Sequence, residues 1–174
     1  MAFTFSNVCG RILYKLGLRN ADKVLTLNST IYDTLIEKSF VNKTNIVLLK
    51  GGEGVDLNRF KYVEDSFVDT KFLMVARVLY DKGYAEYVEA AKIVKKKYPE
   101  IVFELVGPLD VESPMGVPYE VLKQDEASGA FKYLGVLNDI PSKLGEGGIV
   151  IVLPSYHEGL SMSLIEACSM GRPI

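Results

Sequence analysis

The sequence predicts an α/β protein built on a doubly wound parallel sheet. Three observations favour this class. Short, continuously apolar segments that have the character of buried strands alternate along the 174 residues with segments of helical periodicity. Glycine and proline mark many of the boundaries between them. From residue 71 onward the pattern gives four strands separated by helices, which is the arrangement of a parallel sheet covered on both faces.

The first fifty residues contain one strand–helix–strand unit. An apolar segment at 23–27 ends at Asn28-Ser29, and both of these residues are good N-caps for the helix that follows. The second strand is expected at 45–49. Glycines and a charged stretch interrupt the periodicity between residues 51 and 69, so we expect a domain boundary there.

The second part of the chain opens with a strand at 71–77. Apolar side chains then recur at helical spacing from Tyr84 to Tyr98, and Pro99 ends that helix. The strand at 101–106 ends at Gly107-Pro108. The next elements are a polar helix at 119–127, a strand at 131–134, a short helix at 140–144 and a fully apolar strand at 149–153.

The last expected helix covers residues 162–170. Gly171 is the typical residue just after a helix end, and Pro173 follows it. Residues 172–174 therefore stand where the next parallel strand should begin. A lone strand–helix–strand unit at the other end cannot make its own covered sheet. Both ends predict a piece of a larger protein.

Composition excludes several classes of protein. Hydrophobic residues make up 48% of the chain, and 20 basic against 22 acidic residues give a net charge of −2. This balance excludes general disorder and gives no case for nucleic-acid binding. No apolar run approaches the roughly 18 residues that a membrane-spanning helix needs. Two widely separated cysteines favour a reducing cytosol. With only one histidine beside them, they give no basis for a zinc site.

The strongest local signal is the segment 154–166, Pro-Ser-Tyr-His-Glu-Gly-Leu-Ser-Met-Ser-Leu-Ile-Glu. It follows a buried strand and opens a helix, which is where open α/β sheets bind ligands. Gly159 allows close backbone approach, and the amides of residues 160–162 are expected to face an anion at the helix start. Glu158 and Glu166 flank this cradle, where carboxylates are suited to accept hydrogen bonds from sugar hydroxyls.

Two cations form the second signal. Arg77 ends a strand and Lys82-Gly83 precedes a helix, so both side chains belong to the carboxyl edge of the sheet and suit a diphosphate. Each signal has an alternative that needs no ligand. Arg77 and Lys82 also fit solvated surface cations, and Ser163 with Glu166 also fits a capping box.

Weaker signals are set aside. The glycine-rich stretch at 51–54 lacks the spacing of a dinucleotide fingerprint and favours a tight turn or hinge. His157 is the only histidine, and an exposed bystander is favoured over a general acid or base. No P-loop sequence and no Asp-x-Asp pair occurs, so a carboxylate-held Mg²⁺ is not predicted.

Taken together, these segments resemble the family 4 retaining glycosyltransferases, which have the two-Rossmann GT-B fold. The resemblance runs from about residue 21 to 174. It is carried by the Glu158-x7-Glu166 element followed by Gly171-Arg172-Pro173, by the Arg…Lys-Gly element at 75–83, by the interdomain stretch at 54–60 and by the loop at 134–136. The 154–158 segment and the loop after Gly107 resemble most the bacterial capsule and O-antigen enzymes that use UDP-sugars.

The resemblance implies roles for these residues. Arg77 and Lys82 would neutralise the donor diphosphate as the sugar leaves, so that neither a metal nor another cofactor is required. Glu158 would contact the donor sugar and, with these two cations, form the catalytic set. The remaining contacts to the nucleotide sugar would come from the backbones of Gly159, Leu160, Ser161 and Val136, the last beside the base, and from Glu166 on the ribose.

The resemblance also assigns the two parts of the chain. Residues 1–55 would be the tail of the N-terminal acceptor domain with the interdomain linker, and residues 56–174 a truncated nucleotide-sugar-binding domain. The chain would be an incomplete C-terminal half of a GT-B fold. The implied function is retaining transfer from a nucleotide sugar, favouring a UDP-sugar, to a growing surface polysaccharide or lipid-linked oligosaccharide. We expect no turnover from this chain alone, because the acceptor wall is missing.

Implied partners are the nucleotide-sugar donor and a saccharide or lipid-linked saccharide acceptor, with no nucleic acid. The full protein would be cytoplasmic, with peripheral contact to the inner membrane. The basic, partly apolar stretch 11–16 could contribute to that contact, although a helix packed on the missing domain is favoured. An exposed apolar sheet edge predicts self-association of this fragment.

Two alternatives remain for the function. One is a nucleotide-binding module without catalysis. The other is a GT-B-type UDP-sugar epimerase, in which Glu158 or His157 would serve as acid or base. Ser161 stands where relatives often have proline or glycine, which leaves the sugar preference open.

Overall fold

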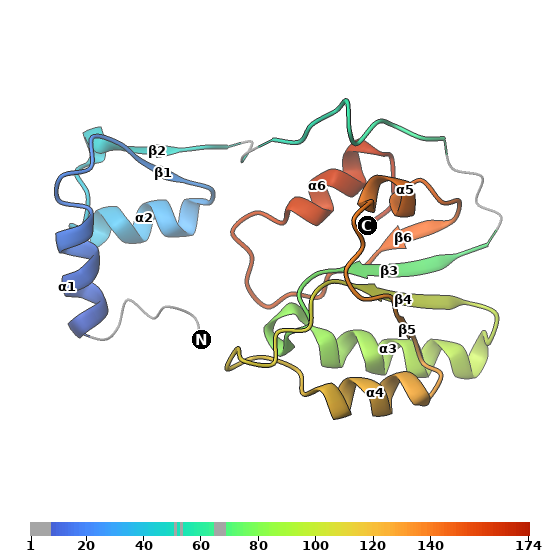
Figure 1. Ribbon diagram of the computed structural model, residues 1–174. Coiled ribbons are helices and arrows are strands. Elements are labelled where there is room, and N and C mark those ends of the chain that lie inside the picture. Colours follow the sequence, from blue (N-terminus) through green and yellow to red (C-terminus); the bar gives the residue numbers. More distant parts are fainter. Residues whose placement is uncertain (1–7, 51, 53, 65–68) are drawn as a thin grey trace. The chain divides into compact units, whose positions relative to one another are not determined.

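The computed structural model describes residues 8–50, 52, 54–64 and 69–174 and divides into two units, Met1–Gly54 and Val55–Ile174. Figure 1 draws both units. Gly51 and Glu53 of the glycine-rich stretch lie outside the described residues, as do residues 65–68 of the expected boundary.

The first unit is a small helical and parallel-strand assembly. Its elements in chain order are α1 (Val8–Gly17), β1 (Val24–Thr26), α2 (Ser29–Glu37), a short 3-10 helix (Lys43–Asn45) and β2 (Ile46–Leu48). Strands β1 and β2 pair in parallel. The predicted cap of α2 is confirmed at Asn28, whose side-chain oxygen accepts a hydrogen bond from the Ile31 amide at 2.8 Å.

A small core holds the first unit together. Leu35, Phe40 and Ile46 are buried, and the Tyr14 ring of α1 stacks on Phe40. The 11–16 stretch is helical and leaves Leu13 and Leu16 largely exposed. No helix in the described part of the chain is long and apolar enough to cross a membrane.

The second unit carries the predicted doubly wound sheet, which is confirmed. Its elements are β3 (Lys71–Val75), α3 (Tyr84–Lys97), β4 (Val102–Val106), α4 (Tyr119–Ala127), β5 (Lys132–Tyr133), α5 (Ile140–Leu144), β6 (Ile149–Ile151) and α6 (Met162–Ser169). All four strands are parallel and lie in the order β5-β4-β3-β6. Helices α3 and α4 cover one face of the sheet, and α5 and α6 cover the other (Figure 1).

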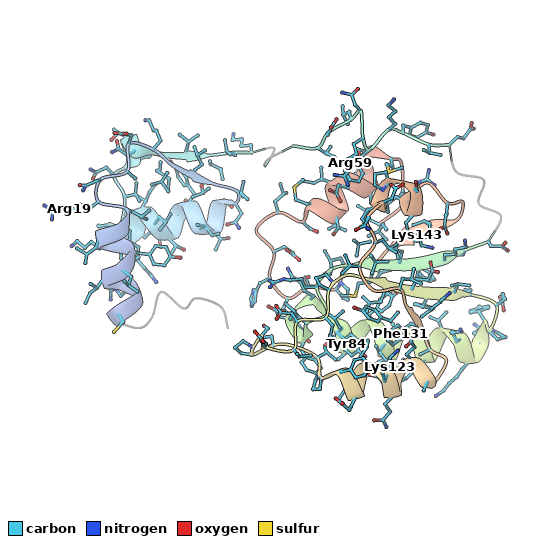
Figure 2. All side chains as sticks on the ribbon, in the orientation of Figure 1. Arg19, Arg59, Tyr84, Lys123, Phe131 and Lys143 are labelled. Atoms are coloured by element: carbon cyan, nitrogen blue, oxygen red, sulfur yellow. The ribbon has the colours of Figure 1, made fainter. Side chains whose placement is uncertain are left out.

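The two faces of the sheet have separate apolar cores. Successive residues of β3 alternate between them, because side chains alternate along a strand: Met74 packs toward α3 and α4, and Leu73 packs toward α5 and α6. In the first core the Tyr84 and Phe131 rings, labelled in Figure 2, meet edge to face with centroids 6.1 Å apart. Burial of the sheet on both faces explains its continuously apolar strands.

The buried face of α3 differs from the predicted apolar stripe at two positions. Tyr98 is 43% exposed, because it lies at the C-cap, where the chain leaves the helix. Tyr87, which the stripe omits, is buried. Its hydroxyl lies 2.9 Å from the Phe72 carbonyl oxygen and 2.7 Å from that of Glu104, so it joins β3 to β4.

A charged network lies on the face covered by α5. Glu104 of β4 is buried and forms an ion pair of 2.6 Å with Lys143, which also bonds Glu146 at 2.9 Å. Burial alone would lower the pKa of Lys143, but its hydrogen bonds to these two carboxylates outweigh burial and raise it. Glu104 and Lys143 of this network therefore each have a partner of opposite sign.

The chain segment after α6 leaves the helix and runs beside strand β6. Gly171 has a φ of +76°, as a C′ glycine requires, and the Arg172 amide bonds the Ala167 carbonyl at 2.9 Å to close the helix end. The Ile151 amide then donates to the Pro173 carbonyl at 2.8 Å. Residues 172–174 thus run beside β6, at the place where the sequence predicts a next parallel strand.

Candidate functional site

The strand order locates a ligand site before any side chain is considered. From β3 the chain moves outward through β4 and β5, then returns to the other side of β3 with β6. The carboxyl ends of β3 and β6 therefore flank the point where the winding reverses. In open α/β sheets this point opens a crevice in which ligands bind.

A cavity of about 280 Å³ lies at this point. Its walls come from the end of β3, from Lys82 and from the segment between β6 and α6. The lining residues are Val75, Ala76, Arg77, Lys82, Leu153, Glu158, Leu160, Ser161, Met162 and Ser163. The structure thus brings five of the sequence-predicted residues, Arg77, Lys82, Glu158, Leu160 and Ser161, to one cavity.

Lys82 and Glu158 bond directly across the cavity. The Lys82 ammonium donates to Oε1 of Glu158 at 2.8 Å, and the Ser155 hydroxyl donates to the same oxygen at 2.7 Å. Both charged side chains are mostly shielded, at 20% and 28% exposure. Sequence reasoning missed Ser155, although it lies three residues before Glu158 in the segment already singled out.

The loop that carries Glu158 is tied to the start of α3. Gly83 has a φ of +80°, and a Cβ atom at this position would lie 2.2 Å from the Pro154 carbonyl oxygen, so only glycine fits. The Tyr156 amide donates to the Asp81 carbonyl at 3.0 Å, and the Tyr156 hydroxyl donates to Glu86. This hydrogen bond lowers the pKa of Glu86. The neighbouring His157 is exposed.

A second cavity of about 260 Å³ lies on the other side of the β3 end. Its lining residues are Val75, Ala76, Arg77, Val106, Gly107, Pro108, Val136, Leu137 and Ile140. Apart from Arg77 the side chains here are apolar or absent, and Val136 is 64% exposed. Gly107 allows the close packing beneath, because a Cβ atom there would lie 1.8 Å from the Ala76 carbonyl oxygen.

Arg77 belongs to both cavities and points to a carboxylate. Its Nη1 lies 3.3 Å from Oδ2 of Asp110, in the loop that follows β4. The Arg77 side chain is 57% exposed. Sequence reasoning did not single out Asp110, because the partner stands 33 residues away and no spacing rule connects them.

The capping-box alternative for Glu166 is wrong. Helix α6 begins at Met162 with Ser161 as N-cap, so Ser163 is inside the first turn and cannot be the cap. Burial raises the pKa of Glu166, and the nearby charge of Arg59 opposes this rise. Neither Glu166 nor Gly159 is among the described residues that line the two cavities.

The described residues contain no group of three or more His, Cys, Asp or Glu side chains placed to hold a metal ion. The residues that line the two cavities supply two cations, a carboxylate bonded to one of them, the start of α6 and an apolar pocket. These groups are suited to a ligand with a charged middle and an apolar or aromatic end.

Known proteins are similar to this chain in sequence and in fold. The chain is 33% identical to the N,N'-diacetylbacillosaminyl-diphospho-undecaprenol alpha-1,3-N-acetylgalactosaminyltransferase of Campylobacter jejuni, over 93% of this chain and 44% of that protein. It is 29% identical to the UDP-Gal:alpha-D-GlcNAc-diphosphoundecaprenol alpha-1,3-galactosyltransferase of Escherichia coli, over 87% and 41%. The chain spans less than half the length of these relatives.

Among solved structures, HepE of Anabaena in complex with UDP and glucose has the same fold. The TM-score is 0.73 at 17% identity, and the match covers 94% of this chain and 46% of that one. Residues 58–174 match the family described as glycosyl transferases, group 1. On this match, which covers more than half of its residues, the chain belongs to the group 1 glycosyl transferases.

Proposed function

We propose that this chain holds the donor site of a retaining glycosyltransferase that uses a UDP-sugar. The observation that carries the proposal is the convergence of Arg77, Lys82 and Glu158 on one cavity at the reversal point of the sheet. The relatives support it: HepE was solved with UDP and glucose, and the Escherichia coli relative is named for UDP-Gal.

The chemistry follows from the charges in the first cavity. When the bond between the anomeric carbon and the diphosphate oxygen breaks, negative charge develops on the leaving diphosphate. Arg77 and Lys82 would stabilise that charge, together with the N-terminal end of α6, where Leu160 and Ser161 line the cavity. Lys82 would exchange Glu158 for phosphate, and this frees the Glu158 carboxylate to accept hydrogen bonds from the sugar.

Retention of configuration needs no further protein group in this proposal. The acceptor hydroxyl would attack from the face that the diphosphate leaves, and the departing phosphate oxygen would take its proton. Arg77, Lys82 and Glu158 are then the catalytic set, each touching the donor. No metal ion or other cofactor enters this mechanism.

The second cavity is assigned to the nucleoside. Its apolar walls suit the flat base, with the backbone of Val136 beside it. Gly159 would supply a further backbone contact to the donor. Glu166 would accept hydrogen bonds from the ribose. Because Glu166 lines neither cavity, this role requires α6 or the nucleoside to move until the carboxylate and the ribose are in contact.

The two units fit the proposed domain assignment. Residues 56–174 would form the donor domain, and residues 1–55 the end of an acceptor domain with its linker. The structural division falls between Gly54 and Val55. For the full-length protein we propose a lipid-linked saccharide acceptor, cytoplasmic work at the inner membrane and a role in surface polysaccharide assembly, because two relatives are named for diphosphoundecaprenol-linked acceptors.

Calorimetric titration of the chain with UDP, GDP and ADP tests the donor site. We expect UDP to bind, and Arg77→Ala and Glu166→Ala each to weaken it about tenfold or more, the scale of a lost hydrogen bond to a charged group. Lys95→Ala and Glu100→Ala are the matched controls, since they remove the same charges from α3 and the turn after it, away from both cavities. Circular dichroism verifies folding of every variant. A folded chain that binds no nucleoside diphosphate would refute the proposal.

A transfer assay on the full-length protein addresses the remaining alternatives. Labelled sugar moving from UDP-sugar to a lipid-linked acceptor excludes a module that only binds nucleotide. Retention of that activity in His157→Ala excludes His157 as the acid or base of an epimerase.

A further inference from the structure

Asp110 is a charged residue bonded to Arg77 that the proposed function leaves without a role. Its Oδ2 faces Nη1 of Arg77 at 3.3 Å. The carboxylate is one-third exposed, at 34%. An ion pair this open contributes little to folding stability, so its presence beside a proposed phosphate ligand calls for another explanation.

The loop that carries Asp110 is fixed by its backbone. Gly116 packs against the Asp110 carbonyl oxygen so closely that a Cβ atom would lie 2.1 Å from it. The Ser113 amide donates to the same carbonyl at 3.3 Å. These contacts fix the backbone of Asp110, from which the carboxylate faces Arg77.

The same loop is fastened to the chain segment that follows Arg77. The Val78 amide donates to the Pro108 carbonyl at 2.9 Å, and the Tyr80 amide donates to the Met115 carbonyl at 2.8 Å. In the loop these bonds lie before and after Asp110, and in the other segment both follow Arg77. The backbone that carries Asp110 is therefore held beside the segment that follows Arg77.

This placement makes the local charge nearly neutral before any ligand binds. Lys82 is paired with Glu158, and Arg77 is paired with Asp110. The two pairs differ in one respect: Glu158 lines the cavity, whereas Asp110 does not. Asp110 thus lowers the attraction that Arg77 exerts on an anion without itself having a surface in the first cavity.

We propose that Asp110 is a counter-charge that acts through Arg77 to weaken binding of the free nucleoside diphosphate relative to the nucleotide sugar. The inference rests on the proposed function. In the donor, the sugar esterifies the terminal phosphate. In the product that phosphate is free, and its second ionisation near pH 6 adds about one negative charge at pH 7.5. Repulsion by a fixed carboxylate rises with ligand charge, so Asp110 penalises the product more than the donor.

The test compares UDP and UDP-glucose binding by calorimetry at pH 7.5. Asp110→Asn keeps the shape and removes the charge. It should tighten UDP binding about two- to fivefold, the range that single exposed ion pairs give, and UDP-glucose binding by a smaller factor. Glu112→Gln removes an exposed carboxylate from the same loop and should change neither affinity. Asp110→Glu retains the charge and should behave as the unmodified chain does.

A purely structural role for Asp110 would lower both affinities, so a gain for UDP distinguishes the two. The proposal is overturned if Asp110→Asn leaves UDP affinity unchanged or weaker, if both ligands gain equally, if Glu112→Gln gives the same gain, or if Asp110→Glu matches Asp110→Asn. Asp110→Ser repeats the measurement should the asparagine variant not fold. If the unmodified chain binds neither ligand, the proposed function fails, and this inference fails with it. Binding by the unmodified chain with no effect at Asp110 defeats the inference alone.

Discussion

Individual residues of the site are predicted better than their partners. The segment 154–166 identifies Glu158 from local sequence alone, because a strand end, a glycine and a helix start occur together. The bonds from Lys82 and Ser155 to that carboxylate, and the one from Arg77 to Asp110, were not foreseen. Two of these three bonds join segments far apart in sequence, and only the folded sheet brings such segments together.

Glu166 combines a stability cost with a proposed binding role. Burial raises its pKa above the ordinary value of 4.5, so between that value and the raised one the folded chain binds more protons than the unfolded chain. The free energy of unfolding therefore falls as pH rises through this window. Below it both states are protonated, and Glu166 has no such effect.

Glu166→Gln should remove this pH dependence. We expect the free energy of unfolding of the variant, relative to that of the unmodified chain, to be higher at pH 7 than at pH 4. The change should be less than about 1 kcal/mol, because the group is partly exposed. Urea denaturation at the two pH values measures the change, and Glu100→Gln serves as the exposed control. An equal difference between variant and parent at both pH values would contradict the assigned cause. The same variant should bind UDP more weakly, so stability and binding would move in opposite directions.

At the scale of elements, the sequence predicts the type and the order of the helices and strands, but it misplaces the ends of some strands. Strand β3 ends at Val75, two residues earlier than periodicity predicts, and β6 ends at Ile151. Just beyond these ends, Ala76 and Val152 each keep one backbone hydrogen bond to a neighbouring strand, whereas Ala76, Arg77 and Leu153 line the first cavity. Apolar pattern alone does not distinguish a strand from the wall that continues it.

Gly83 links two elements, and its replacement should affect both stability and binding. In Gly83→Ala the new Cβ would meet the Pro154 carbonyl in a backbone conformation that alanine disfavours. We expect a loss of about 2–4 kcal/mol in the free energy of unfolding and weaker UDP binding, since Lys82 and the Glu158 loop must separate. Gly129→Ala is a matched control: its φ is +76°, but nothing lies within 4 Å of the added atom.

Chemical denaturation and UDP titration of both variants separate strain from contact. Gly129→Ala should cost only about 1–2 kcal/mol and leave UDP affinity unchanged. Equal losses in the two variants would mean that the Pro154 contact is unimportant.

At the scale of the whole molecule, the sequence predicts two parts and a boundary between residues 51 and 69, and the structural division falls after Gly54. The parallel winding of the second part follows from its buried strands and its crossover helices. The strand order, which places β6 beside β3, does not follow from any local pattern. The position of the site in the sheet depends on that order. The geometry of the site therefore could not be predicted from the sequence alone.

The two units predict independent behaviour. Every described residue that lines the two cavities lies between Val75 and Ser163, inside the second unit. Residues 55–174 produced alone should therefore fold and bind UDP within about twofold of the longer chain. Circular dichroism and calorimetry on the two proteins provide the comparison. A shortened chain that folds but binds UDP more than tenfold more weakly would assign part of the site to the first unit.

The three residues Val75, Ala76 and Arg77 form a wall that both cavities share. Under the proposed function, any larger side chain on this wall alters recognition of the nucleoside and of the sugar diphosphate at once. The outer walls are separate: Leu153, Glu158 and the four residues from Leu160 to Ser163 bound one cavity, and Val136, Leu137 and Ile140 bound the other. Evolution or engineering of a new donor sugar can therefore proceed through the first outer wall without changing the nucleotide, provided that the shared partition stays as it is.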